Sequence, residues 1–479
     1  MLFSRTLAGA AALALCLPAL AQTVTGVSFV NGITVSGGSL DLSAGSDFDR
    51  RVGFFSDIYY DRNRNEWWGL SDRGPGGGTL PYETRLQRFT LDVNPDTGAI
   101  SNFAVAQTIK FNNAGSAFNG LGPQVPSFLG YSFDPEGMVV NPVTGNLLVS
   151  DEYGPSLYEF NRSGQLVKAF TVPSNLLPRA GASTDYNALP VAGLTSGREP
   201  NRGAEGLAIS PDGKYAYSML QNGTIQDGWS AAGGGTRGQY TRIVKYDVAT
   251  GQAVAQYAYK LQSSGQGRGI SAIVALGSDR FLVLERNNRG VGVGANVASP
   301  DKNVYEIDLS TATDVTGISL PASGALPPGQ VAAVKVAKVM DLDADTLAAL
   351  GNKSPEKWEG LAVGPQLTNG KYLVLAGTDN DYSVTQSGSG EQFDVWFNFG
   401  DADPYASSIQ CPIGQTTGCF LTSNNATAAT WNSNLSLLPG ILHAYTANIS
   451  GYIAPIPAPG SLVLAASALA LLGWRRRRS

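Results

Sequence analysis

The chain contains a single histidine, His443, and only three cysteines in 479 residues. One histidine allows at most one histidine-based dyad, and this residue lies outside the repeated segments described below. The G-x-S-x-G elbow, the Walker loop and the H-E-x-x-H motif are all absent. These absences argue against serine-triad hydrolases, P-loop nucleotide hydrolases and zinc proteases.

Charged residues are also scarce, at 15% of the chain, and no basic run is interleaved with aromatic residues. Nucleic-acid-binding domains carry such basic patches, so we expect no nucleic-acid partner. Five of the 33 basic residues are Arg5 and Arg475–Arg478, in the terminal segments, which leaves 28 basic against 38 acidic residues. The domain between the ends is therefore acidic and better suited to binding cations.

Residues 1–21 have the pattern of a signal peptide. Arg5 precedes an apolar run from Leu7 to Leu20, and Ala19-Leu20-Ala21 predicts cleavage before Gln22. The alternative is a buried N-terminal helix. Cleavage would remove the first cysteine, so Cys411 and Cys419 remain, and in an oxidising compartment we expect them to form a disulfide.

The C-terminal residues 451–479 form a Pro-rich linker, a short apolar segment from Leu462 to Trp474 and the block Arg475–Arg478. The apolar segment is marginal against the roughly 20 residues of a spanning helix, and the arginines should hold its end in the cytoplasm. The pattern resembles the PEP-CTERM sorting signal of Gram-negative bacteria. That resemblance implies transient membrane anchoring, cleavage by an exosortase-type enzyme and release to the cell surface or outside; a permanent tail anchor is the alternative.

The clearest local pattern between these ends runs from Phe133 to Phe170. Turn residues, including Asn141-Pro142-Val143-Thr144-Gly145, separate short runs rich in apolar and β-branched residues. A four-stranded meander of this kind cannot bury both of its faces alone, but copies packed around an axis can, as in a β-propeller. The expected strands are Met138–Val140, Leu147–Ser150, Ser156–Phe160 and Gln165–Phe170.

Similar segments recur five times, 63 to 91 residues apart, and these steps leave room for long connecting loops. A sixth blade can be built from the two ends of the domain. We therefore predict an all-β propeller of six four-stranded blades over residues 22–450. The repeats are anchored at Asp57, Glu136, Glu205, Arg268 and Glu359.

Four of these anchors are acids, which would form a carboxylate ring at one mouth of the central channel. Crowded carboxylates must either hold protons or bind a cation, and hard oxygen ligands suit Ca²⁺. Alternatively, each acid binds backbone amides and has only a structural role. Further polar residues follow the second strand of the repeats and should lie at the same mouth: Asp72, Arg73, Asp151, Glu152, Glu285 and Asp379.

We expect a metal site made by Glu136, Glu205 and Glu359, at which Ca²⁺ polarises an ester or phosphoryl oxygen and lowers the pKa of a bound water. Glu152 or Asp57 would act as general base. Arg73 would hold the anionic substrate, and Arg268 is a second candidate for that clamp or for pairing with the carboxylates.

Several segments also resemble the phytase-like family, whose members carry the label of esterase-like activity. The resemblance covers roughly residues 50–400 and implies a β-propeller that hydrolyses phosphoesters or carboxylesters, with possible calcium assistance. The R-H-G-x-R-x-P motif of histidine acid phosphatases is absent, which excludes that mechanism. The matching pieces are SDRGP at 71–75, DPEGMVV at 134–140, SDEYGPSLYEF at 150–160, AEGLAISPDGK at 204–214, LERN at 284–287 and WEGLAV at 358–363.

Two other functions fit the sequence. The Glu-Gly strand starts resemble those of gluconolactonase and strictosidine-synthase propellers, where the glutamate binds a divalent metal, so a lactonase is the alternative enzyme. The sorting signal equally suits a non-enzymatic surface or matrix protein that binds a partner or glycan. If the protein is an enzyme, we expect its substrate to be a small-molecule ester or phosphoester. A binding protein would not turn such a molecule over.

Overall fold

The computed structural model describes residues 21–455, except 188–192, 229–237, 264, 267, 295 and 388–389. The predicted signal peptide, apart from Ala21, and the tail from residue 456 onward lie outside the described residues. Within the described part, no helix is both long and apolar enough to cross a membrane.

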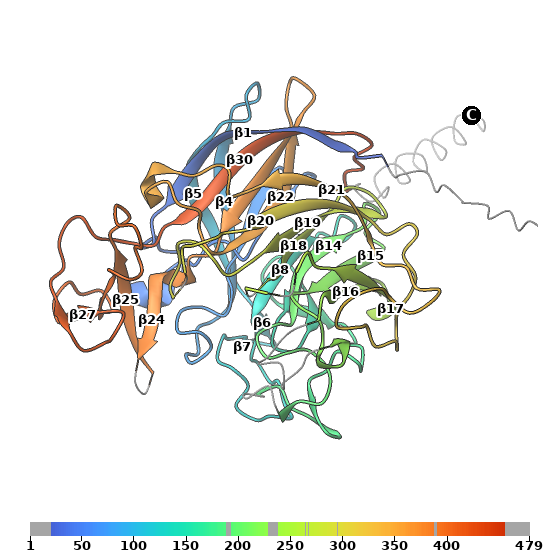
Figure 1. Cartoon of the computed structure of the whole chain (residues 1–479), viewed down its shortest axis with the longest axis horizontal. Helices are drawn as coiled ribbons and strands as arrows, with labels where there is room; N and C mark the ends of the chain where they lie inside the picture. The colour runs from blue at the N-terminus through green and yellow to red at the C-terminus, as the bar shows by residue number, and fades with distance from the viewer. Residues whose placement is uncertain are drawn as a thin grey trace, which may run out of the picture.

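The described chain is almost entirely β-structure, and five of its sheets are four-stranded antiparallel blades arranged around a centre (Figure 1). The first four blades each use consecutive strands. They are β2 (Asp57–Asp61), β3 (Glu66–Leu70), β4 (Arg85–Val93) and β5 (Ile100–Lys110); β8 (Pro135–Val140), β9 (Leu147–Asp151), β10 (Ser156–Phe160) and β11 (Leu166–Ala169); β14 (Ala204–Ile209), β15 (Tyr215–Leu220), β16 (Tyr240–Asp247) and β17 (Gln252–Lys260); and β18 (Gly269–Ala275), β19 (Arg280–Arg286), β20 (Lys302–Asp308) and β21 (Val334–Asp341).

The fifth blade joins the two ends of the chain. Its order is β22 (Trp358–Gln366), β23 (Tyr372–Thr378), β30 (Gly440–Ile449) and β1 (Val24–Val35). The N-terminal strand thus pairs with the last strand and closes the ring. This closure also corrects the predicted blade count. The two ends complete the fifth blade and do not build a sixth, so in the described residues the propeller has five blades.

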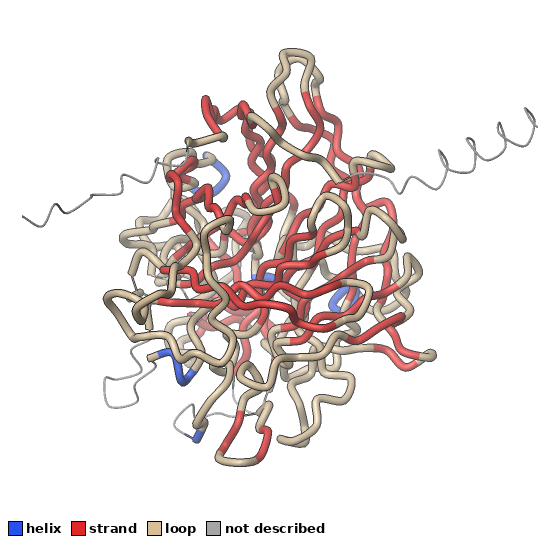
Figure 2. The backbone as a smooth tube through the Cα atoms, turned by 90° about the vertical axis from the view of Figure 1, so that its right-hand side faces the viewer, coloured by secondary structure: helices blue, strands red, loops and turns tan. Residues whose placement is uncertain are grey.

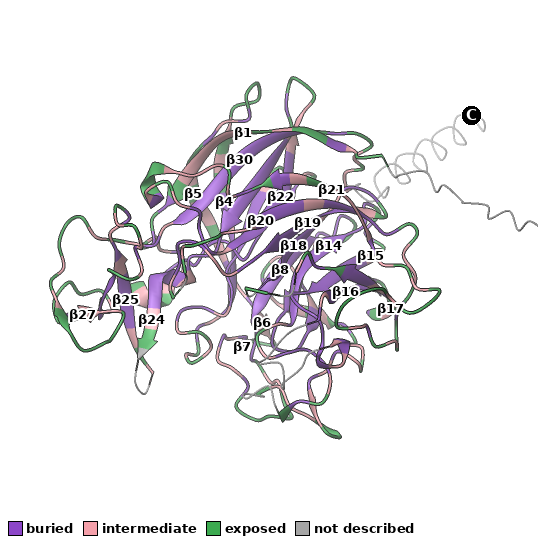
Figure 3. Cartoon of the chain, in the orientation of Figure 1, coloured by how far each residue is buried: buried purple, intermediate pink, exposed green. Residues whose placement is uncertain are grey.

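The inner strands and the core confirm that the ring closes with five blades. The inner strands contact one another in the cycle β2, β8, β14, β18, β22 and back to β2. A separate apolar cluster fills each of the five blade boundaries; between the first two blades, for example, Trp68 and Leu86 pack with Val149. Figure 3 shows the burial concentrated along these strands. Burying both faces of every sheet supplies the stability that a single meander lacks.

The second blade follows the predicted meander closely, because its turns carry the residues that tight turns require. Asn141 Oδ1 accepts a hydrogen bond from the Val143 backbone N–H at 2.9 Å, and Gly145 has a φ of +76°. Such a left-handed backbone is open to glycine and strained for most residues. Loops of this kind join the strands throughout the molecule (Figure 2).

A sixth sheet is inserted between β23 and β30 and lies to one side of the propeller in Figure 1. Cys411 and Cys419 form the predicted disulfide within it. No separate pattern in the sequence predicted this sheet. Its strands are β24 (Val384–Ser387), β25 (Glu391–Phe397), β26 (Ile409–Pro412), β27 (Cys419–Leu421), β28 (Ala428–Ala429) and β29 (Ser436–Leu437).

Candidate active site at the channel mouth

Four of the five inner strands begin with a β-bulge. The ladder of β14 leaves out Glu205, and that of β22 leaves out Glu359. In β8 the irregularity spans Glu136 and Gly137, and in β18 it falls at Ser271. Bulges turn a side chain away from the regular alternation and are frequent beside active sites. Here they place three glutamates at equivalent points of three blades.

The glycine after each of these glutamates lies where neighbouring inner strands approach closely. A Cβ atom on Gly206 would lie 2.8 Å from the backbone nitrogen of Ile273, and one on Gly137 would lie 2.6 Å from that of Leu207. No side chain fits at such a distance. The Glu-Gly pair therefore has two functions, a carboxylate at the mouth and a close contact between blades.

The three glutamates line one polar cavity of about 140 Å³. Further side chains reach it from the ends of the second strands and from the segments that precede the inner strands. Six carboxylates and four cationic groups are present, so ionised acids would exceed bases by two. The acids are Asp72, Glu136, Glu152, Glu205, Glu359 and Asp379, and the cations are Arg73, Arg202, Arg286 and Lys357.

Neighbouring carboxylates surround Glu136, while the charges of Arg286 and Arg202 partly offset those around Glu205. Glu205 accepts a hydrogen bond at Oε1 from Gln221, while its Oε2 is buried without a hydrogen-bond partner among the described residues. Burial raises the pKa of both glutamates well above the usual range, and neighbouring carboxylates raise it further. A cation among these oxygens would remove the repulsion.

A second group of acids lies directly beside Glu136. Carboxylate oxygens of Asp72, Asp134 and Glu136 lie within 4.8 Å of one another, and all three residues are buried. Burial raises the pKa of Asp134 to about 7, against the opposing charge of Arg73. Oxygen-only donors at this separation have the chemistry that Ca²⁺ prefers.

Glu359 is paired more fully than the other two ring glutamates. Arg286 on β19 donates from Nη2 to Glu359 and from Nε to Ser271 Oγ at 2.8 Å. The fourth blade thus has a serine at its bulge and supplies an arginine from its second strand. Burial raises the pKa of Glu359 to about 7, and the Arg286 charge opposes that rise.

Arg73 connects the first blade to the second. Its backbone N–H and its Nη1 donate to the carboxylate of Asp134 at 3.1 and 2.5 Å. The same Nη1 lies 3.7 Å from Glu152 Oε2, and Nε has no partner among the described residues. Arg73 and Glu152, predicted as anion clamp and base, are therefore neighbours at the cavity wall.

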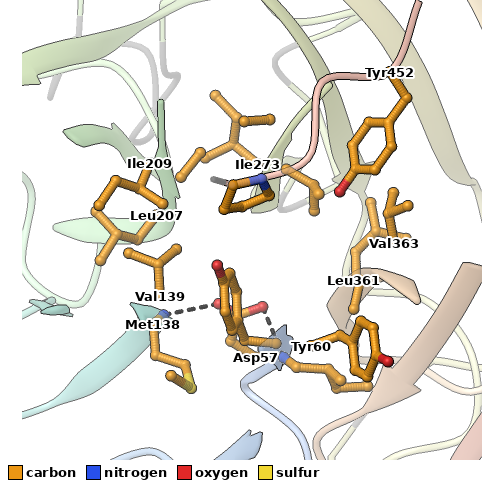
Figure 4. Close-up of a pocket in the computed structure, with 17 residues that line it drawn as sticks. Asp57, Tyr60, Met138, Val139, Leu207, Ile209, Ile273, Leu361, Val363 and Tyr452 are labelled. Carbon is orange, nitrogen blue, oxygen red and sulfur yellow. Dashed lines mark hydrogen bonds between the residues drawn. The ribbon is translucent and has the colours of Figure 1, made fainter. Parts of the chain in front are cut away.

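Asp57 does not belong to the carboxylate ring, which corrects the expectation of four equivalent acids. Its strand β2 has no bulge, so Asp57 pairs in register with Leu70. Its carboxylate accepts the backbone N–H groups of Ile58 and Met138, each at 2.8 Å (Figure 4). It lines a separate, mostly apolar pocket inside the channel, toward Tyr452. Burial raises its pKa well above normal, and its position suits a tie between blades better than a general base.

Three other predicted residues also lie outside the polar cavity. Arg268 pairs with Glu285 at 3.4 Å and with Asp301, so it is not the second anion clamp. Glu285 also accepts from Tyr259 Oη at 3.0 Å. Asp151 accepts the backbone N–H groups of residues 134, 153 and 154, and it shapes the turn that presents Asp134 and Glu152.

The sequence reasoning missed four residues of the site. A local signal exists for two of them, because Arg202 and Lys357 stand three and two positions before a Glu-Gly pair. Arg286 ends a second strand, but its pairing across the blade boundary with Glu359 is not encoded in any local pattern. Asp134 belongs to the DPEGMVV segment that carries the family resemblance, but no role was predicted for it.

Comparisons with known proteins identify a family. A family model described as "Phytase-like: Esterase-like activity of phytase" matches residues 50–382. An uncharacterized secreted protein of Arthroderma benhamiae is 25% identical over 421 residues, which cover 69% of this chain and 80% of that protein.

Two solved structures illustrate how distant the matches among known folds are. Hydrazine synthase of Kuenenia stuttgartiensis shares 12% identity at a TM-score of 0.28, over 71% of this chain and 80% of that one. An inactive virginiamycin B lyase variant of Staphylococcus aureus shares 10% identity at a TM-score of 0.25, over 68% and 64%.

Proposed function

Because the chain belongs to the phytase-like family, we propose that it is an exported, metal-assisted hydrolase of phosphoesters or carboxylesters that acts at the polar cavity. The observation that carries this proposal is the buried, unpartnered Oε2 of Glu205 beside Glu136. Such oxygens are costly unless a cation or proton occupies them, and they lie in the same cavity as Arg73.

The metal site we propose is centred on Glu136 and Glu205, with Asp72 and Asp134 beside them. These donors fit Ca²⁺, because all are carboxylates and they come from three different blades. When bound, Ca²⁺ would supply positive charge that polarises an ester or phosphoryl oxygen. Glu359 was also expected among the ligands; its pairing with Arg286 makes it a weaker donor, so we place it at the edge of the site.

In the mechanism we propose, Arg73 binds the anionic oxygens of the substrate and orients the ester for attack. Glu152 accepts a proton from the attacking water. A new bond forms between the water oxygen and the phosphorus or carbonyl carbon, the bond to the leaving oxygen breaks, and that oxygen leaves as an alcohol after taking up one proton. Positioning and charge stabilisation of this kind are the main sources of rate in phosphoryl and acyl transfer.

We propose export by the N-terminal signal and sorting by the C-terminal tail. The secreted relative supports export. Transient anchoring, exosortase-type cleavage and release at a Gram-negative cell surface remain part of the proposal. Neutral replacements for Arg475–Arg478 should leave unprocessed protein, which fractionation and mass spectrometry would detect; normal processing would exclude this sorting route.

The decisive experiment screens the purified domain with Ca²⁺ against aryl phosphates, aryl esters and lactones. The variant Glu136→Gln/Glu205→Gln keeps the side-chain shapes and removes both charges. Its kcat/KM should fall at least about a hundredfold, while the exposed Glu391→Gln control should match the wild type. Hydrolysis that survives in the double variant would place the chemistry elsewhere.

The same screen separates the alternatives. Turnover of lactones alone would favour the lactonase. A lack of turnover in every class would favour a non-enzymatic surface or matrix propeller, in which the cavity binds a partner or glycan.

A further inference from the structure

A second cleft of about 240 Å³ adjoins the polar cavity, and the two share Asp72 and Arg73 in their walls. One wall of this outer cleft is the glycine-rich loop that follows Arg73. The opposite wall is β24 of the inserted sheet, at Val384, Thr385 and Gln386. The outer cleft is therefore built between the propeller and the inserted sheet.

The charge of the outer cleft differs from that of the polar cavity. Its acids are Asp72 and Asp381, and its one cationic side chain is Arg73, which it shares with the cavity. The remaining walls are uncharged, with apolar groups at Val293 and Val384, alongside hydroxyl, amide and backbone groups. Asp381 pairs with Lys357, whose Nζ also lies 3.0 Å from Asp379, and Arg73 pairs with Asp134. A second anionic group placed here would therefore meet two carboxylates whose neighbouring cations are already paired.

Specific contacts hold the two walls together. Thr79 Oγ1 lies 2.7 Å from the carbonyl oxygen of Gly76 and 2.9 Å from Gln386 Oε1, which ties the glycine-rich loop to β24. A Cβ atom on Gly74 would lie 2.2 Å from Tyr82, so the loop backbone lies directly on that ring. The ring of Tyr82 in turn packs against the ring of Tyr382, with 5.5 Å between the two ring centroids.

The backbone at the floor of the outer cleft is strained. Asp381, Tyr382 and Ser383 have φ values of +47°, +54° and +54°, three consecutive non-glycine residues in the left-handed region. Residues held in this region are strained and persist only where the surrounding structure holds them. Ser383 Oγ supplies that hold, since it donates to Val395 O and accepts from the Leu438 N–H, both at 2.8 Å.

We propose that the outer cleft binds the leaving part of the substrate, and that this part is uncharged and rich in hydroxyl groups. The inference rests on the proposed hydrolase function and narrows its substrate class. A substrate would place its single anionic ester against Arg73, while its neutral remainder contacts Thr385, Gln386 and the glycine-rich loop. Polyphosphorylated substrates are disfavoured, because Asp72 and Asp381 would repel their additional charges.

Calorimetry with Ca²⁺ tests this with three probes: inorganic phosphate, fructose 6-phosphate and fructose 1,6-bisphosphate. The two sugar phosphates share a ring and differ by one phosphate. The wild type should bind fructose 6-phosphate at least about tenfold more tightly than either other probe. Thr385→Arg should weaken the binding of fructose 6-phosphate about tenfold and leave the affinity for inorganic phosphate unchanged. It should also reduce the difference in affinity between fructose 6-phosphate and the bisphosphate.

Two variants serve as controls. Thr385→Ser keeps the hydroxyl and should bind like the wild type, and Thr90→Arg adds the same charge at an exposed position of β4. Equal wild-type affinity for phosphate and fructose 6-phosphate, or tighter binding of the bisphosphate, would overturn the proposal. The predicted binding pattern without any ester turnover would leave the cleft assignment standing and refute the hydrolase function.

Discussion

Gln221 donates from Nε2 to Oε1 of Glu205 at 2.9 Å and leaves Oε2 of the same carboxylate buried without a partner among the described residues. The amide thus fixes the orientation of the Glu205 side chain and occupies only one of its two carboxylate oxygens. Glu136, on the neighbouring blade, repels Glu205. A cation bound at the unpartnered Oε2 of Glu205 would relieve this repulsion.

Calcium should therefore stabilise the mature domain. A ligand at 100 times its Kd that binds only the folded state adds about 2.7 kcal/mol to the free energy of unfolding, enough to raise Tm by about 3 °C or more. Differential scanning calorimetry in Ca²⁺ and in chelator measures the shift. Glu136→Gln/Glu205→Gln should abolish it, and Glu391→Gln should retain it. Superimposable melting curves in calcium and chelator would refute a metal at this site.

Local patterns predicted the strands of the blades, whereas contacts between residues distant in sequence determine the number of blades. The turn residues of Phe133–Phe170 specify their meander directly, so the strands of the second blade were found within a few residues. The blade count was wrong because Val24–Val35 pairs with a strand more than 400 residues later. No periodicity in the N-terminal segment reveals that partner.

The same distinction holds at the site. Glu-Gly pairs marked the three ring glutamates, because the same strand start recurs along the chain. Asp57 was assigned to the ring because it begins a similar segment, but only the hydrogen-bond register shows that β2 lacks the bulge. Arg286 was missed because its role depends on Glu359, 73 residues later.

The free energy of unfolding in chelator should depend on pH through the same carboxylates. Burial raises the pKa of Glu136 and Glu205 well above that of an unfolded chain and that of Glu359 to about 7. Their favourable contribution is complete below about pH 4 and is lost as pH rises through the native-state pKa of each group, because only the native state retains the protons.

Urea titrations from about pH 4.5 to 7.5 would measure this slope, which is about 1.4 kcal/mol per pH unit for each proton retained. Glu136→Gln/Glu205→Gln should have the shallower decline. His443, whose pKa burial lowers to about 4, contributes an opposite slope that both proteins share. Parallel curves would mean that the two glutamates do not hold protons in the native state.

Glu306 should be needed to hold the N-terminal strand at the ring closure. This buried residue of the fourth blade accepts the backbone N–H groups of Thr23 and Val24 at 2.9 and 3.0 Å and pairs with Arg280 at 2.7 Å. Glu306→Gln removes the charge from these bonds and should cost about 2 kcal/mol. Hydrogen exchange would show lost protection first in β1, and the exposed Glu391→Gln should change nothing. A uniform loss of protection across all blades would contradict the prediction that Glu306 stabilises β1 locally.

The close approach of β14 to β18 at Gly206 should tolerate no side chain. Gly206→Ala places a methyl group 2.8 Å from the backbone nitrogen of Ile273, so β14 and β18 must separate, which should cost about 1–3 kcal/mol. Gly277→Ala is the matched control, because its methyl group would meet only Ile453, at 3.9 Å, and should change the free energy of unfolding by less than about 0.5 kcal/mol. Urea unfolding of both variants measures the difference. Because Gly206 follows Glu205 directly, Gly206→Ala should also weaken calcium binding, which calorimetry at a temperature where the variant is folded would detect. Equal stability of the two variants would mean that neighbouring blades can move apart freely, and a mouth built by their contact would then have no fixed geometry.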